Sequence, residues 1–162
     1  MAKKITKKGY EALQLELKNL IEVVRPDIID KLKTARSYGD LSENAEYDAA
    51  RDAQARNEAR IAELEEKLAE IDANPALIIP SNIYEVEYKN KQGKKQKLKF
   101  EIAGVDEIDP FKKDSKGEMV PIFSNESPLG QALEGAKKGD VVTVVMPTGS
   151  VEYTVINVEG EN

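Results

Sequence analysis

The chain has 162 residues, of which 33% are charged and 40% hydrophobic, and its formal net charge is −6. It contains no cysteine and no histidine. Disulfides, thiol nucleophiles and the usual histidine general bases and metal ligands are therefore excluded, so any chemistry rests on carboxylates, hydroxyls, lysine or arginine. The acidic balance also argues against an autonomous nucleic-acid binder.

The N-terminal residues are basic but are not followed by the apolar core of a signal peptide. No run of about 18 apolar residues is present, which is the length that a membrane-spanning helix needs. We therefore expect a cytoplasmic protein that does not enter a membrane.

A first long helix is predicted to begin after Thr6, which can serve as its N-cap, with Ile5 and Tyr10 placed for a hydrophobic staple. Apolar residues then recur at alternating spacings of three and four, as in a coiled-coil seam. Pro26 interrupts the pattern and predicts a kink at about Val24 to Pro26, but the apolar stripe resumes beyond it. The predicted seam residues are Tyr10, Leu13, Leu17, Leu20, Val24, Ile28, Leu32 and Ala35.

A second helix is predicted over residues 44–73, and Pro75 marks its end. Leucine and isoleucine dominate the far half of its seam, whereas alanine, glutamine and asparagine occupy the half nearest the preceding turn. We expect the leucine-rich half to supply most of the packing. The seam residues are Tyr47, Ala50, Gln54, Asn57, Ile61, Leu64, Leu68 and Ile71.

The turn between the helices, residues 38–44, would form the tip of an antiparallel hairpin and carries two acids, Asp40 and Glu43. These acids have two possible roles. Asp40, or its rival Ser42, could cap the second helix, with Glu43 completing a capping box. Alternatively, the two carboxylates could contribute oxygen ligands to Mg²⁺ if another site supplied the rest of the coordination shell.

Six basic residues lie in the helices on either side of the turn. They could form a solvated face among acidic residues, which is the usual meaning of such a pattern. They could instead form a patch that meets RNA phosphate or an acidic protein surface. The six are Lys31, Lys33, Arg36, Arg51, Arg56 and Arg60.

After Pro75 the hydrophobic pattern changes to a period of two, which predicts strands. Ser127 and Pro128 have the residue types of an N-cap and first helical position, and predict a short helix to about residue 135. The fold class is therefore α+β, with a helical coiled-coil hairpin in residues 1–75 and a mostly antiparallel sheet with one short helix in residues 76–162. Strands are expected at 76–79, 83–88, 96–103, 119–123, 140–146 and 151–158, with a polar loop at 106–118.

The segment from Ala35 to Arg51, with GDLSENAEY at its centre, closely resembles the signature of the bacterial Gre transcript cleavage factors. The opening TKKGY, the segment NESPLGQAL and the segment GDVV resemble the same family, in the same order. The resemblance covers nearly the whole chain. The hairpin lacks a pronounced basic excess, which is closer to the GreA branch than to the GreB branch.

This resemblance implies that the second domain has an FKBP-like fold and docks on RNA polymerase near its secondary channel, while the hairpin enters the channel. Asp40 and Glu43 would then help to hold a second Mg²⁺, shared with the polymerase active site, and orient the attacking water. The polymerase would cleave backtracked RNA near its 3′ end. We expect a monomer that binds no cofactor stably by itself and is not an enzyme by itself.

The resemblance also implies partner-binding residues. Arg36 and Arg51 flank the tip and would contact polymerase or RNA. Asn44 would shape the tip or contact the partner, whereas Tyr47 is expected to pack in the first helical turn. Ser127 and Pro128 would lie near the polymerase contact, although capping already explains both residues.

One segment departs from the family pattern, because residues 109–121 form a longer connection than is usual and suggest a surface-loop insertion. Three other functions stay open. The chain could be a channel-binding inhibitor of polymerase, a coiled-coil adaptor, or a prolyl isomerase or chaperone. The last would need an aromatic-lined pocket, for which its second half offers Tyr84, Tyr88, Phe100, Phe111, Phe123 and Tyr153.

Overall fold

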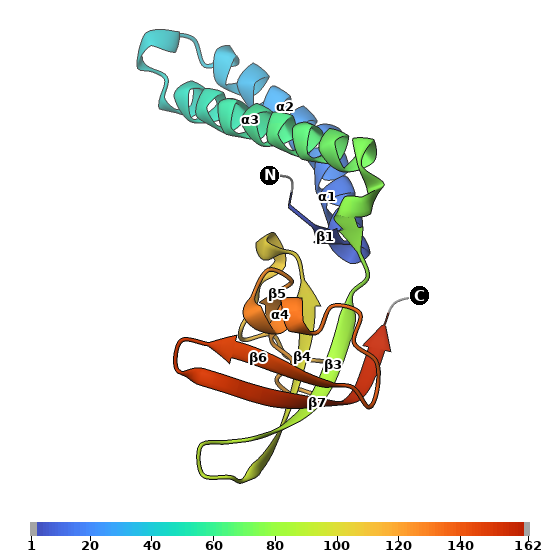
Figure 1. The fold of residues 1–162 in the computed structure, drawn as a ribbon. Helices are drawn as coiled ribbons and strands as arrows, with labels where there is room; N and C mark the ends of the chain where they lie inside the picture. The colour runs from blue at the N-terminus through green and yellow to red at the C-terminus, as the bar shows by residue number, and fades with distance from the viewer. Residues whose placement is uncertain (1–2, 161–162) are drawn as a thin grey trace. The chain divides into compact units, whose positions relative to one another are not determined.

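The computed structural model describes residues 3–160, and these form two compact units (Figure 1). One unit is the helical segment Tyr10–Pro75. The other unit joins the residues before Tyr10 to the segment that follows Pro75. The sequence-based boundary at residue 75 coincides with this division, but the residues up to Gly9 had been assigned to the hairpin and instead belong with the sheet.

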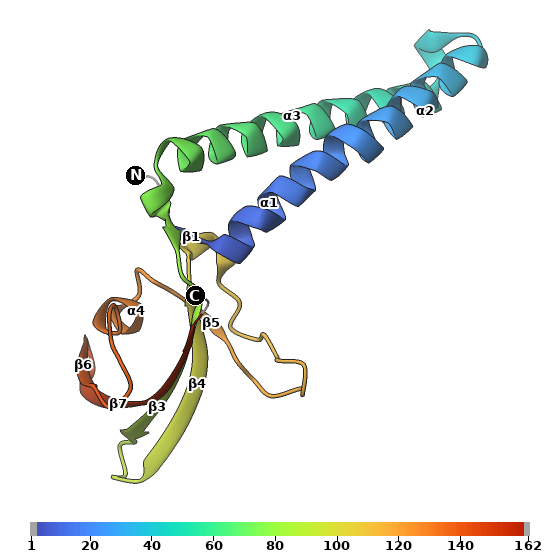
Figure 2. The same cartoon turned by 90° about the vertical axis from the view of Figure 1, so that its right-hand side faces the viewer.

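The helical unit is an antiparallel hairpin, in which α2 and α3 lie side by side in both views (Figures 1 and 2). The apolar seam explains this pairing, because the residues buried on α3 are members of the predicted seam. The helices are α1 (Lys7–Asn19), the π-helical η1 (Leu20–Val24), α2 (Arg25–Ser37), the 3₁₀ turn η2 (Leu41–Glu43) and α3 (Ala45–Ala73).

The predicted kink at Pro26 takes the form of a π-helical turn directly before the proline. The backbone N–H of Arg25 donates to the carbonyl of Leu20, one residue further back than in an α-helix. This turn accommodates a ring that donates no hydrogen bond and would clash with a preceding carbonyl. The apolar stripe continues through it, and Ile28 and Leu32 are buried beyond the turn.

The tip half of the hairpin has an apolar cluster of its own, so packing is not confined to the leucine-rich half. Ile28, Leu32 and Ala50 are buried together, and Val24, Tyr47 and Ala53 pack against them. In the other half of α3, Leu64 is fully buried. The helices are therefore fixed to each other up to the last turns before the tip.

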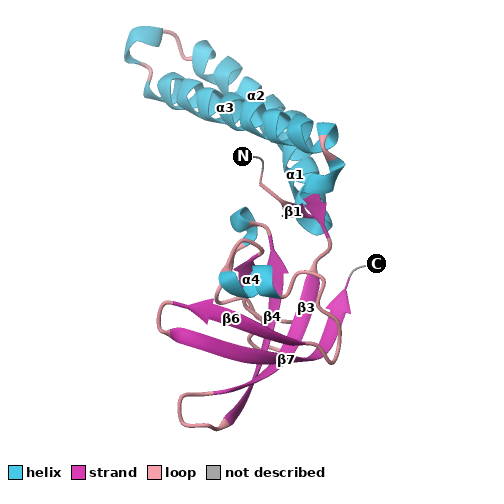
Figure 3. Cartoon of the chain, in the orientation of Figure 1, coloured by secondary structure: helices cyan, strands magenta, loops and turns pink. Residues whose placement is uncertain are grey.

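The other unit contains a curved five-stranded sheet with the short helix α4 on one face (Figures 2 and 3). The strand order is β5-β4-β3-β7-β6, and neighbours are antiparallel except for the parallel pair β4 and β5. The core lies between the sheet and the segment around α4, and includes Val86, Phe100, Leu133 and Val155. The elements are β3 (Asn82–Lys89), β4 (Lys95–Ala103), η4 (Val105–Glu107), β5 (Ile122–Ser124), α4 (Pro128–Ala132), β6 (Val141–Met146) and β7 (Gly149–Gly160).

A two-stranded parallel sheet in the same unit was not predicted. Its strands are β1 (Ile5–Thr6) and β2 (Ile78–Ile79), and β2 follows the 3₁₀ turn η3 (Pro75–Leu77). The strand predicted over 76–79 is thus shorter than expected. Ile5 and Thr6, which were expected to open the first helix, form a strand, and Thr6 still caps α1 by accepting a hydrogen bond of 3.1 Å from the N–H of Gly9.

The loop predicted over 106–118 folds back on itself. Isolated β-bridges pair Asp109 with Ile122 and Lys113 with Met119. Within residues 3–160, no helix is both long enough and apolar enough to cross a membrane.

Candidate functional site

The hairpin tip begins where α2 ends, at Tyr38 and Gly39. The N–H of Gly39 donates to the carbonyl of Arg36 over 3.2 Å. Gly39 has a φ of 103°, a left-handed conformation that side chains disfavour and that commonly terminates helices at glycine. The glycine therefore releases the chain from α2 and directs it into the acidic turn.

Asp40 caps η2 rather than the long helix α3. Its Oδ1 accepts hydrogen bonds from the N–H of Ser42 at 2.9 Å and from the Ser42 hydroxyl at 2.7 Å. These bonds stabilise the ionised carboxylate, first through the hydroxyl and then through the backbone, and hold the pKa of Asp40 below its usual range. The other carboxylate oxygen, Oδ2, makes no hydrogen bond with any residue in 3–160.

Asn44, and neither Asp40 nor Ser42, is the N-cap of α3. Its Oδ1 accepts from the N–H of Tyr47 at 3.0 Å, and its Nδ2 donates to the carbonyl of Ala35 at 2.7 Å. One side chain thus starts α3 and joins it to the last turn of α2. Both polar ends of the side chain that was expected to contact a partner are used within the tip.

Glu43 is exposed and forms neither a hydrogen bond nor an ion pair with any residue that the structure describes. The capping box suggested by the sequence is absent, because Glu43 precedes α3 instead of occupying its first turn. Asp40 and Glu43 are therefore two exposed acids on one short turn. Their oxygens suit Mg²⁺, but no group of three or more potential ligands occurs among residues 3–160.

Arg36 and Tyr47 interact across the hairpin near the tip. The guanidinium carbon of Arg36 lies 5.8 Å from the centre of the Tyr47 ring, within the range of a cation–π contact. Tyr47 is half-buried against the apolar cluster of the tip half, which confirms the packing role predicted for it. Arg36 itself is exposed beside the acidic turn.

The six basic residues do not form one continuous free patch. Lys31 pairs with Asp27 at 3.0 Å. Arg60 pairs with Glu16 at 2.8 Å, and this bond raises the pKa of Arg60. The members without an ion pair to any residue in 3–160 are Lys33, Arg36, Arg51 and Arg56, all of which are exposed.

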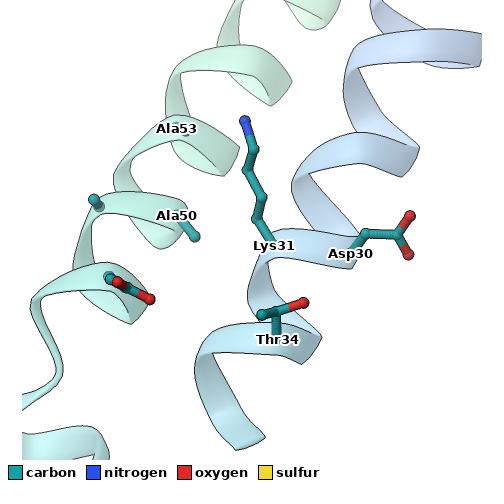
Figure 4. A pocket seen from close by; sticks show the side chains of 7 residues that line it. Asp30, Lys31, Thr34, Ala50 and Ala53 are labelled. Atoms are coloured by element: carbon teal, nitrogen blue, oxygen red, sulfur yellow. The ribbon is translucent and has the colours of Figure 1, made fainter. Parts of the chain in front are cut away.

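An open groove of about 490 Å³ follows the side of the hairpin close to the tip. Ala50 and Ala53 of α3 face it from one side and Lys31 and Thr34 of α2 from the other (Figure 4). Only the alanines at 49, 50 and 53 indicate this groove in the sequence. Small side chains there keep the hairpin narrow behind its tip.

Ser127 and Pro128 have the structural roles that their sequence predicted. The hydroxyl of Ser127 accepts from the N–H of Gly130 at 3.0 Å and donates to the carbonyl of Ser124 at 2.6 Å, and Pro128 is the first residue of α4. These contacts account for both residues without a partner. They also fix the conformation of this exposed corner of the sheet unit.

The aromatic residues that could line the pocket of a prolyl isomerase do not lie together. Tyr84 and Phe100 stack in the core with centroids 5.9 Å apart, and Phe123 packs against Phe100. Tyr88 and Tyr153 form a separate pair, and the ring of Phe111 is exposed. The six rings do not converge on one pocket.

Two family models match the chain. "Transcription elongation factor, N-terminal" matches residues 3–72, and "Transcription elongation factor, GreA/GreB, C-term" matches residues 84–160. The chain belongs to the GreA/GreB family.

Relatives of this family member carry the name transcription elongation factor GreA. One from Chlorobium phaeovibrioides is 41% identical over 155 residues, covering 93% of this chain and 92% of the relative. One from Mesoplasma florum is 43% identical over 168 residues, covering 97% and 100%. The chain is thus a GreA-like transcription elongation factor.

Among solved structures, the Thermus thermophilus GreA factor homolog 1 (Gfh1) is 24% identical and covers 97% of this chain and 98% of its own, with a TM-score of 0.38. Membership of the GreA/GreB family rests on the sequence matches and agrees with the resemblance carried by the tip motif.

Proposed function

We propose that this GreA-like factor binds RNA polymerase through its sheet unit and inserts the hairpin into the secondary channel. There it stimulates the polymerase's own Mg²⁺-dependent cleavage of backtracked RNA near the 3′ end, which rescues arrested complexes. The observation that carries this proposal is the pair of exposed acids at the tip. Glu43 has no partner within residues 3–160, and Asp40 keeps its Oδ2 available.

The two acids would act as ligands that a second site completes. A second Mg²⁺ in the polymerase active site would supply an activated water and stabilise charge on the phosphate. Asp40 contributes an oxygen from a side chain that Ser42 holds in place, and its lowered pKa keeps the carboxylate ionised. Glu43 contributes a second oxygen from the same turn. Neither acid needs to bind the ion alone.

Nearby residues would support this arrangement without taking part in the reaction. Asn44 preserves the tip by joining the ends of α2 and α3. Arg36 and Arg51 are exposed on opposite helices beside the tip, where guanidinium groups can pair with RNA phosphate or acidic groups of the polymerase. Ser127 and Pro128 would shape the part of the sheet unit that meets the polymerase.

The test is RNA cleavage in a stalled, backtracked elongation complex at equal polymerase occupancy. The variant Asp40→Asn/Glu43→Gln removes both tip charges, and Glu46→Gln/Asp48→Asn removes two charges from the exposed first turn of α3 as a matched control. We expect the tip variant to lose roughly 100-fold or more of the stimulation, because metal-ion stabilisation supplies several kcal/mol and about 1.4 kcal/mol is a factor of ten.

Equal stimulation by the wild type and the tip variant would show that the acids serve only the local fold, and the proposed mechanism would be wrong. Binding by the wild type without any stimulation would instead indicate a factor that occupies the channel and inhibits the polymerase. The control variant should behave as the wild type in either case.

A further inference from the structure

A carboxylate in the sheet unit is the centre of a cluster that the tip chemistry does not use. Glu107, the last residue of η4, accepts hydrogen bonds from the N–H of Thr6 at 3.0 Å and from the N–H of Gly104 at 2.8 Å. The hydroxyl of Thr6 donates to the same carboxylate. Three donors thus converge on one half-buried acid, and no lysine or arginine in residues 3–160 pairs with it.

Two glycines are packed closely against this cluster. A Cβ on Gly9 would lie 2.1 Å from Oε1 of Glu107, and a Cβ on Gly104 would lie 1.9 Å from the carbonyl oxygen of Lys4. A larger residue at Gly104 would meet backbone, and a larger residue at Gly9 would force the Glu107 carboxylate out of its place. The glycine of the opening TKKGY segment is therefore explained by the position of Glu107.

The cluster holds the first residues of α1. Thr6 is 2% exposed, and its hydroxyl also caps α1 by accepting from the N–H of Gly9. The adjoining strand β1 pairs in parallel with β2, so the chain segment that leads into the hairpin is joined to the segment that leaves it. Glu107 binds this junction through Thr6, although 101 residues separate the two in sequence.

We infer that Glu107 is a positioning residue, which fastens the root of α1 to the sheet unit and so limits how far the hairpin swings about its attachment. For its effect on cleavage the inference rests on the proposed function above. The hairpin is long, because the 29 residues of α3 rise about 1.5 Å each. A small rotation at its root therefore produces a large displacement at its tip.

The length of the hairpin makes its root important. A swing of about 5° would move the end of an arm roughly 40 Å long by roughly 4 Å. Misplacement of catalytic groups by about 1 Å can cost on the order of 100-fold in rate. A docked sheet unit can therefore present Asp40 and Glu43 accurately only if the root of the hairpin is held firmly.

The experiment compares Glu107→Gln with Asp106→Asn, which removes the neighbouring exposed acid that pairs with Lys3 at 3.3 Å. Because the chain has no cysteine, Ala62→Cys in α3 and Ser150→Cys in β7 introduce the only two thiols for spin labels. The distance distribution between the labels reports swing of the hairpin in the full chain, without polymerase. Cleavage stimulation at saturating factor is measured on the same variants without labels.

Thr6→Val and Thr6→Ser test the same contact from the Thr6 side if Glu107→Gln fails to fold. Valine removes the hydroxyl that donates to Glu107 and accepts from the N–H of Gly9, whereas serine retains it. We expect Glu107→Gln and Thr6→Val to widen the distance distribution clearly and to lower stimulation at least about tenfold, in keeping with the sensitivity of rates to misplacement. Asp106→Asn and Thr6→Ser should resemble the wild type in both measurements.

An unchanged distance distribution in Glu107→Gln, or in Thr6→Val where the former does not fold, would overturn the inference. A wider distribution with full stimulation would also overturn it, because swing of the hairpin would then not matter for cleavage. If the wild type itself gives no stimulation, the proposed function fails, and the distance distribution alone still decides whether Glu107 restrains the hairpin.

Discussion

The acids at the tip and the acids of the sheet unit occupy opposite environments. Asp40 and Glu43 are exposed, and Glu43 has no partner within residues 3–160. In the sheet unit, Glu101 is buried and bonded to Ser81 and Lys112, and Glu107 receives three hydrogen bonds. Because the chain has 30 acidic residues, composition alone does not distinguish the two kinds of acid. Their hydrogen bonding does.

The difference shows that carboxylates are saturated by protein donors in one region and left available to a partner in the other. A carboxylate whose oxygens are saturated by protein donors stabilises the fold and is unavailable to a metal ion. A carboxylate without such donors adds little to the fold and keeps its oxygens for a partner. We therefore expect acid-to-amide substitutions in the sheet unit to lower stability, and those at the tip to lower cleavage stimulation with little change in stability.

Glu101→Gln should produce the larger effect on stability. Its side chain is 10% exposed, accepts from Ser81 and pairs with the partly exposed Lys112 at 3.1 Å, and loss of a hydrogen bond to a charged group costs about 1.5 to 3 kcal/mol. Calorimetric unfolding should show a lower transition temperature for the sheet unit, whereas Asp40→Asn lies in the hairpin tip and should leave the transition of the sheet unit unchanged. Similar unfolding of the two variants would remove the proposed distinction.

Asn44→Ala should have an intermediate effect, confined to the hairpin. It removes the cap of α3 and the bond to the Ala35 carbonyl, and loss of such a cap costs about 1 to 2 kcal/mol. Helix melting followed by circular dichroism would measure this loss. Asn44→Asp retains the acceptor for the Tyr47 N–H, so it should be less damaging, and equal loss in both variants would assign the effect to the Ala35 bond instead.

Ser42→Ala should have the smallest effect, visible mainly in the titration of Asp40. The Ser42 hydroxyl is the main cause of the lowered pKa of Asp40. Because this pKa is lower in the folded turn, ionised Asp40 favours the turn above the usual aspartate range, and that contribution is lost as the pH falls through the lowered pKa.

Carboxyl NMR should show the pKa of Asp40 rising towards its usual value in Ser42→Ala. Ser37→Ala removes an exposed serine whose hydroxyl donates to the Thr34 carbonyl and does not touch Asp40, so it is the control. An unaltered titration in Ser42→Ala would show that the backbone N–H of Ser42 alone sets the pKa.

Features that depend on local sequence patterns could be predicted from the sequence. The seam of α3, the cap at Ser127 and the hairpin with its acidic tip all depend on residues close together in the chain. The cap of α3 was misassigned because Asp40, Ser42 and Asn44 are all good capping residues, and only the bond from Asn44 to Ala35 favours the last.

Features that depend on distant residues could not be predicted. The pairing of β1 with β2 joins residues 5 and 78, and nothing in a two-residue strand indicates its partner. The contact of Thr6 with Glu107 is likewise invisible locally. The sequence predicts a polar surface loop in this region, but the placing of Lys112 beside buried Glu101 by residues 109–121 depends on the fold.

The π-helical turn has a consequence for the reach of the hairpin. The carbonyl of Leu20 accepts from Arg25 within the turn and also from the side-chain amide of Asn57 on α3, which is 7% exposed. Sliding one helix past the other by a turn, about 5.4 Å, would leave that amide buried without a partner. Asn57 therefore fixes the register of the two helices relative to each other. A fixed register gives the hairpin a constant length.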